Sequence, residues 1–360
     1  MEKHNLLRGR SVDVNFIRTV AIIGVVLLHA SGRYTITSQE LSQMNPLQFA
    51  GWGMVDFYQS IAVTVGVPLF LMTTGALLLE PGKNESLKTF FRKRWVRIGL
   101  PLIFWGIVYF VWDFLVIKIP FTAESIIQGI LNGPYTQFWY MYVLIGLYLL
   151  TPILRIFISH ADEALVKYFL LIWIIGVSIL PFIGLFTTFT LSNNVFTLTG
   201  YVGYFVFGTY LLTVKAKRSM MTAFIVGGLA LTAIGTYVLA ATSAVDMYFF
   251  QEYFSPTILV ASTMLFMLFL TFPPLERHGA NEQPLRNKLI KIIGENTLAI
   301  FFIHVIILES IQNGYFGLAL NRDTLNPVLE VPFITVIVLF ASLGIVLLLK
   351  QVPHLKKIIG

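Results

Sequence analysis

The chain has 360 residues, of which 56% are hydrophobic and 12% are charged, and its mean hydropathy is +0.78. Soluble domains are about one quarter charged, so this composition excludes an ordinary soluble domain and indicates a polytopic membrane protein. The absence of cysteine excludes disulfides, cysteine-ligated metals and a cysteine thioester intermediate. The net charge of +7 could suit nucleic acid, but the bases lie in short loops between apolar runs, where they set membrane topology.

Ten apolar runs are long enough to cross a bilayer as helices. We therefore predict an all-α polytopic membrane protein with about ten transmembrane helices. The predicted helices cover residues 12–31, 57–79, 96–117, 138–159, 165–186, 197–214, 220–242, 256–273, 292–311 and 331–350.

The basic residues between these runs predict the orientation. Of the 25 lysines and arginines, 21 are assigned to one face: the N-terminal segment, the loops that follow the second, fourth, sixth and eighth predicted helices, and the C-terminal tail. Only Arg33, Lys118 and Arg322 lie on the opposite face, and Arg18 lies within the first helix. By the positive-inside rule, both termini are expected in the cytoplasm. We expect residues 1–360 to form a single membrane-embedded domain in the inner (cytoplasmic) membrane, with no appended soluble domain.

The first predicted helix contains two ionisable residues, Arg18 and His29. Eleven residues correspond to about three helical turns plus ~20°, so both side chains project from one face, about 16 Å apart along the axis. An ionisable residue in a spanning helix usually faces a cavity and marks a functional site. A histidine can act as a general base, and an arginine can hold a phosphate or an oxyanion. Alternatively, Arg18 extends to the near interface and His29 is a packing residue.

A basic stretch precedes the third predicted helix and ends in Lys93, Arg94 and Arg97. The loop between the second and third predicted helices holds six basic residues, which is more than are needed to set the orientation in the membrane. Arg94 and Arg97 are three residues apart and share a helical face, where they could bind phosphate at the cytoplasmic surface. We take these two arginines and Lys93 as candidate cofactor-binding residues, although topology alone would explain a few positive charges there.

Secondary candidates lie in the fourth and ninth predicted helices. Tyr140 and Tyr142 are near the outer boundary, where tyrosines also form the ordinary interfacial belt. His304 is the other histidine inside a spanning run, with Glu295 upstream of it. It could take part in chemistry or be structural. The sequence has no HExxH, P-loop, nucleophile elbow or dinucleotide-binding motif, and we expect no metal.

The outer face is acidic and aromatic. Carboxylates and aromatic faces suit hydroxyl-rich ligands such as sugars, but an interfacial aromatic belt with solvated loop acids has the same composition. The residues are Glu40, Asp56, Asp113, Glu124, Asp246, Glu252, Asp323 and Glu330, with Tyr34, Trp52, Trp112, Tyr135, Tyr248, Tyr253 and Tyr315.

At these residues the chain resembles acyltransferase family 3, the integral-membrane enzymes that O-acylate bacterial surface glycans and some lipids or small molecules. Relatives often carry an acid three residues before the first-helix arginine, where this chain has Asn15. The resemblance covers nearly the whole chain. Its motifs are the spacing of Arg18 and His29, the RxxR of Arg94 and Arg97, and segments 67–79, 138–155, 200–211 and 293–305.

The resemblance implies an O-acetyltransferase that moves an acetyl or other short acyl group from cytoplasmic acetyl-CoA or another acyl-CoA to a hydroxyl of a surface or lipid-linked saccharide. His29 and Arg18 would then be the catalytic residues, with His29 as the base, and Arg18, Arg94 and Arg97 would bind the donor. The expected partners are the lipid bilayer, acyl-CoA and the saccharide, with no nucleic acid. A proton-coupled transporter or flippase of a polar or lipid-linked substrate is the alternative. The acceptor, the acyl chain and any covalent carrier stay open.

Overall fold

The computed structural model describes residues 13–80, 85–120, 122–187, 200–242, 247–273, 284–315, 317, 319–320 and 326–360. All secondary structure in these residues is helical. The elements are α2 (Val14–Gly32), α3 (Ser38–Ser42), α4 (Pro46–Val65), α5 (Val67–Leu78), α6 (Leu87–Arg94), η1 (Trp95–Gly99), α7 (Leu100–Trp112), η2 (Asp113–Ile117), α8 (Ala123–Asn132), η3 (Thr136–Phe138), α9 (Trp139–His160), α10 (Glu163–Ile174), η4 (Ile175–Ile179), α11 (Leu180–Phe186), α12 (Val202–Tyr210), α13 (Arg218–Ala241), η7 (Phe249–Gln251), α14 (Pro256–Phe269), α15 (Leu285–Glu295), α16 (Thr297–Gln312), α17 (Pro327–Leu349) and α18 (Leu355–Ile358).

Eight helical stretches in the described residues are long and apolar enough to cross a membrane, and a ninth is obtained if the bent pair α15 and α16 counts as one span. The prediction of an all-helical polytopic membrane protein is confirmed. The eight stretches are Val14–Gly32, Pro46–Leu78, Leu87–Ile117, Thr136–His160, Glu163–Phe186, Arg218–Ala241, Phe249–Phe269 and Pro327–Leu349.

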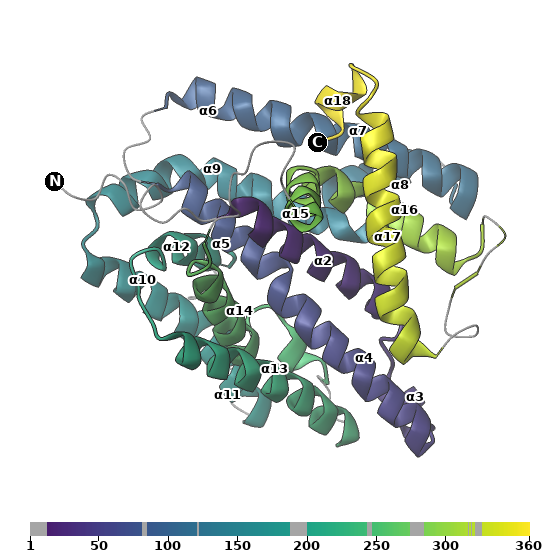
Figure 1. Ribbon diagram of the computed structural model, residues 1–360, viewed down its shortest axis with the longest axis horizontal. Coiled ribbons are helices and arrows are strands. Elements are labelled where there is room, and N and C mark those ends of the chain that lie inside the picture. Colours follow the sequence, from purple (N-terminus) through teal and green to yellow (C-terminus); the bar gives the residue numbers. More distant parts are fainter. Residues whose placement is uncertain are drawn as a thin grey trace.

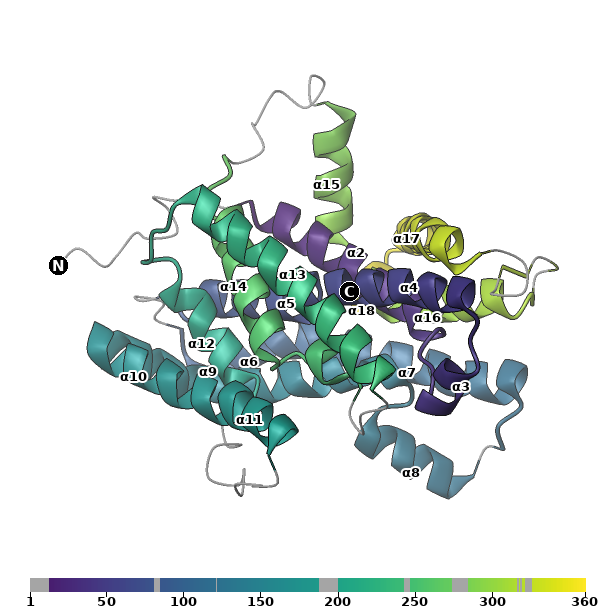
Figure 2. The ribbon, with the colours of Figure 1, turned by 90° about the horizontal axis from the view of Figure 1, so that it is seen from below.

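Two predicted helices look different in the structure. The run 197–214 contains the nine-residue helix α12, which covers only about 14 Å of a hydrocarbon core of about 30 Å. Residues 197–199 of that run lie outside the described residues. The run 292–311 is not one straight helix, because the chain bends by 83° at Asn296 between α15 and α16. Figure 2 shows α15 standing away from the other helices, while α16 lies among them.

Helix α2 lies in the interior of the bundle (Figure 1) and packs against α4, α5, α15, α16 and α17. Gly24 permits the close approach, because a Cβ atom there would lie 2.3 Å from Cγ2 of Val65 and 3.0 Å from the backbone nitrogen of Gly66. Small residues allow helix backbones to approach closely in membrane proteins. The fold therefore surrounds the one helix that carries both Arg18 and His29.

Side-chain caps define where the first two long helices begin. The Asp13 carboxylate accepts the backbone N–H groups of Asn15 and Phe16, at 3.0 and 3.1 Å, and α2 starts directly after it. Asn45 and Gln48 form a reciprocal capping box at the start of α4. This cap starts the helix at Pro46, well before the predicted apolar run that begins at residue 57.

Helices α5 and α12 cross with almost no side chain between them. A Cβ atom at Gly75 would lie 1.8 Å from the carbonyl oxygen of Phe205, and one at Gly208 would lie 2.0 Å from the carbonyl oxygen of Met72. The Thr209 hydroxyl donates a hydrogen bond of 3.0 Å to the Gly75 carbonyl across the same crossing. The short helix α12 is thus held in the bundle by backbone contact with α5.

Replacing Gly75 by alanine should force α5 and α12 apart. Overpacking of this kind typically costs about 1–3 kcal/mol, and more where backbone must move. We expect Gly75→Ala to lower the thermal unfolding temperature of the detergent-solubilised protein by several degrees. The matched control is Gly146→Ala in α9, where no heavy atom lies within 4 Å of the added Cβ. An unfolding temperature of Gly75→Ala equal to that of the control would contradict the close crossing.

Candidate functional site

Helix α2 lines two cavities. Arg18 lines one of about 390 Å³, which we call the basic cavity, and His29 lines one of about 560 Å³, which we call the His29 cavity. The basic cavity is defined by Arg18, Lys93, Arg94, Arg97, Thr74, Tyr140, Tyr148 and Thr297 together with apolar residues. The polar lining of the His29 cavity is His29, Arg33, Thr35, Gln59, Tyr135, Thr136, Tyr248, Gln251, Glu252, Tyr253, Glu309 and Gln312.

The two cavities lie end to end along the same helices. On α16, Phe301 lines the basic cavity and Val305, one turn later, lines the His29 cavity. Ring contacts run from one level to the other. The ring centres of Tyr140 and Phe301 are 5.6 Å apart, those of Phe301 and His304 are 6.0 Å apart, and those of His304 and His29 are 5.0 Å apart. Aromatic and imidazole rings in contact with one another therefore lie between the two cavities.

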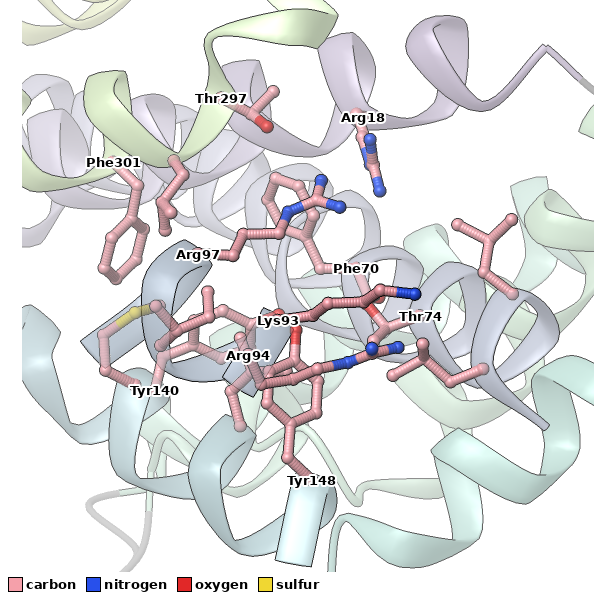
Figure 3. A pocket seen from close by; sticks show the side chains of 16 residues that line it. Arg18, Phe70, Thr74, Lys93, Arg94, Arg97, Tyr140, Tyr148, Thr297 and Phe301 are labelled. Atoms are coloured by element: carbon pink, nitrogen blue, oxygen red, sulfur yellow. Dashed lines mark hydrogen bonds between the residues drawn. The ribbon is translucent and has the colours of Figure 1, made fainter. Parts of the chain in front are cut away.

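The basic side chains of the first cavity come from two parts of the chain. Lys93 and Arg94 lie in the last turn of α6, and Arg97 lies in the π-helical turn η1 that joins α6 to α7. Such π turns often occur at functional sites. Figure 3 shows the nitrogen ends of these three side chains and of Arg18 turned toward the same space.

The Arg18 guanidinium has no hydrogen-bond or ion-pair partner among the described residues, and its backbone is firmly placed by α15. The Thr19 hydroxyl donates to the Ile290 carbonyl at 2.9 Å. A Cβ atom at Gly294 would lie 2.6 Å from the Asn15 carbonyl oxygen, so α15 crosses the first turn of α2 in direct contact. Arg18 is therefore positioned by its helix, while its charged group is available to an anion.

Glu85 lies beside the basic cavity and neutralises part of its charge. Its carboxylate is 2.6 Å from Nζ of Lys93, 3.5 Å from Nη1 of Arg94 and 3.9 Å from Nη1 of Arg155. The pKa of Glu85 lies below its usual range because Lys93 donates a hydrogen bond to it, and the positive charges around it add to this effect. Glu85 is thus ionised at neutral pH and holds basic groups that an incoming anion would also attract.

Arg155 in α9 also contacts this cluster. Its Nε donates a hydrogen bond of 2.7 Å to the carbonyl of Leu78, at the C-terminal end of α5. The guanidinium groups of Arg94 and Arg155 lie 4.1 and 4.9 Å from the ring centre of the buried Phe90. Cation–π contacts of this kind hold guanidinium groups in fixed positions. Sequence reasoning counted Arg155 only as a loop charge, although it ends the recognised segment 138–155.

Polar groups of the His29 cavity are held from several helices. Glu309 of α16 accepts hydrogen bonds from the Tyr135 hydroxyl and, at 3.1 Å, from Nε1 of Trp112. Gln251 of η7 donates to the carboxylate of Asp56 in α4. These contacts hold the Glu309 carboxylate and the Gln251 amide in place at the edge of the cavity.

His29 itself is half-buried, and neither of its ring nitrogens has a hydrogen-bond partner among the described residues. His304 on α16 is fully buried against it. An imidazole that lines a cavity without an internal partner can meet a proton of a bound ligand. His29 is thus accessible from the cavity, as a general base must be.

Of the other candidate residues from the sequence, Tyr140 lines a cavity, whereas Tyr142 and Glu295 do not. Tyr140 is buried and lines the basic cavity. Tyr142 donates a hydrogen bond of 2.6 Å to the Ile130 carbonyl, and it lines neither cavity. Glu295 is exposed at the end of α15 and also lines neither. Within the described residues no group of three or more potential metal ligands occurs.

Comparison with known proteins gives the class of this protein. A family model described as an acyltransferase domain matches residues 11–347, nearly the whole chain. This range includes the residues that line both cavities. The protein is a membrane acyltransferase. The chain belongs to acyltransferase family 3, as its motifs indicate. No curated protein and no solved structure matches the chain in the corresponding comparisons.

Proposed function

We propose that the protein transfers an acetyl or other short acyl group from cytoplasmic acyl-CoA to a hydroxyl of a saccharide or lipid-linked saccharide. The observation that carries this proposal is the pair of cavities placed end to end along α2, one strongly basic and the other lined by His29, carboxylates and amides. The protein would thus work within the inner membrane, with a donor entering from one face and an acceptor from the other.

The basic cavity fits the phosphate groups of coenzyme A. Four cationic side chains line it, and none of the described residues that line it is acidic. Guanidinium groups bind phosphate through paired hydrogen bonds, so Arg94 and Arg97 suit the pyrophosphate better than lysines would. The concentration of basic residues in this part of the sequence supports a cytoplasmic position under the positive-inside rule.

In this proposal Arg18 binds the donor and takes no part in the chemical step. It lies about 16 Å along α2 from His29, too far to hold an oxyanion that forms at the His29 cavity. Its guanidinium, which has no partner among the described residues, can instead hold a phosphate or the polar arm of the donor. The acyl-bearing end of that arm would pass the rings of Tyr140 and Phe301 to reach His29.

The His29 cavity fits a hydroxyl-rich acceptor. Glutamine amides and carboxylates can form paired hydrogen bonds with sugar hydroxyls, and tyrosine rings can pack on sugar faces. The side chains that could do so include Gln59, Tyr135, Tyr248, Gln251, Glu252, Tyr253, Glu309 and Gln312.

The chemical step follows from the basicity of a neutral imidazole. The acceptor oxygen attacks the thioester carbonyl carbon while His29 takes the hydroxyl proton. The carbon–sulfur bond then breaks, and the thiolate of coenzyme A leaves; the proton held by His29 passes to it, which gives the thiol and restores the neutral imidazole. Because this reaction explains both cavities and agrees with the family, we favour it over the transporter or flippase alternative.

Removing the imidazole should stop transfer without affecting donor binding. We expect His29→Ala to lower turnover by about 10²–10⁴, the usual contribution of a general base. Coenzyme A binding should stay unchanged, since the basic cavity lies elsewhere on α2. Transfer of radiolabelled acetyl groups to membrane glycans measures the first quantity, and calorimetry measures the second. The control is His160→Ala at the exposed end of α9. Normal turnover by His29→Ala would remove His29 from the mechanism.

Arg97→Lys keeps the charge that sets topology and removes the two-pronged geometry. We expect normal insertion and about tenfold weaker coenzyme A binding, which corresponds to about 1.4 kcal/mol. Arg92→Lys is the matched control, because Arg92 lies exposed in α6 and does not line the cavity. If both variants bind coenzyme A with wild-type affinity, Arg97 contributes to topology only.

Glu85→Gln should have the opposite effect on the donor. The carboxylate competes with phosphate for Lys93 and Arg94 at neutral pH, since its pKa is held low. Glu85 pairs with three cations, but each partly exposed ion pair is worth about 1 kcal/mol or less, so we expect coenzyme A to bind about fivefold more tightly. Glu163→Gln, which breaks the exposed pair with Lys167, is the control. Weaker binding by Glu85→Gln would show that Glu85 positions the cations instead of competing for them.

A further inference from the structure

The imidazole rings of His29 and His304 face each other inside the bundle, on α2 and α16. Their ring centres are 5.0 Å apart, with an angle of 58° between the ring planes. His29 lines its cavity, whereas His304 has no exposed surface and lines neither cavity. A fully buried second imidazole therefore lies directly beside the one that lines the cavity.

The hydrogen bonds of His304 fix its tautomer. Its Nδ1 lies 2.7 Å from the carbonyl oxygen of Phe301 and 3.2 Å from that of Ile300. A carbonyl oxygen can only accept, so Nδ1 must carry the hydrogen. In a neutral imidazole the other nitrogen, Nε2, is then a bare acceptor. This Nε2 is buried and has no hydrogen-bond partner among the described residues.

His29 is the group placed to satisfy that acceptor. Neither of its own nitrogens has a hydrogen-bond partner in the described part of the chain, and one of them carries a hydrogen in the neutral ring. Two imidazoles joined by an N–H···N bond of about 3 Å have ring centres about 5 Å apart. The observed spacing of 5.0 Å is compatible with such a bond, which would form when the His29 ring turns so that one of its nitrogens meets Nε2 of His304.

We propose that His304 is a positioning residue for His29. Its Nε2 accepts the N–H of His29 and thereby leaves the other nitrogen of His29 bare, directed to the cavity where the acceptor hydroxyl lies. The N–H that donates to His304 stays in place when His29 takes the proton, so the imidazolium keeps its orientation. This inference rests on the proposed function for the base role of His29, but the contact between the rings does not.

The first test uses the intact protein labelled with ¹⁵N-histidine, and signals are assigned from the spectra of His29→Gln and His304→Gln. We expect a single tautomer for His29 and a nitrogen–nitrogen coupling across the hydrogen bond to His304. Two tautomers of His29 without this coupling would overturn the proposal. If His29→Ala were fully active, the proposed base would fail although the coupling was present, so the two failures are distinguishable.

The second test separates positioning from packing. His304→Leu removes the acceptor and keeps an apolar side chain, whereas His304→Gln places an amide oxygen near the former Nε2. We expect His304→Leu to lower kcat about 10–100-fold, as when a partner that orients a metal-bound histidine is lost, with KM for acyl-CoA within twofold of wild type. His304→Gln should keep most of the activity. Equal losses in the two variants, at wild-type thermal stability, would assign His304 to packing.

Discussion

The structure depends on one constraint, the placement of ionisable groups inside an apolar bundle. A charge or an imidazole in a spanning helix is tolerated where it faces a protein-lined cavity. Arg18 and His29 both lie on α2, which is surrounded by α4, α5, α15, α16 and α17. Because the neighbouring helices close around α2 along its length, Arg18 and His29 open into separate cavities at two levels. The division that we propose between a donor side and an acceptor side is based on this geometry.

Most of the helical fold could be predicted from the sequence, because apolar runs of spanning length are a strong signal in membrane proteins. The places where prediction was incomplete have local causes. The start of α4 is specified by the capping box of Asn45 and Gln48, which a hydropathy pattern does not detect. The bend at Asn296 and the short helix α12 depend on contacts with other helices, such as the crossing at Gly75. Hydropathy contains no information about such contacts.

The candidate site was predictable where residues are close in sequence. The shared face of Arg18 and His29, and the RxxR of Arg94 and Arg97, follow from helical periodicity. Contacts between distant segments could not be predicted in this way. Arg155 joins the basic cluster from α9, and His304 meets His29 from α16. The acidic and aromatic outer residues were recognised only as a composition, and the structure brings some of them together around the His29 cavity.

A cryo-electron microscopy structure of the membrane-embedded protein with bound coenzyme A tests the central claim most directly. The account predicts that the phosphate groups lie in the basic cavity against Arg18, Arg94 and Arg97, and that the pantetheine arm runs along α2 toward His29. The thiol end should lie beyond the ring of Phe301, within reach of a hydroxyl in the His29 cavity. Coenzyme A bound with its phosphates in the His29 cavity, or outside both cavities, would contradict the account.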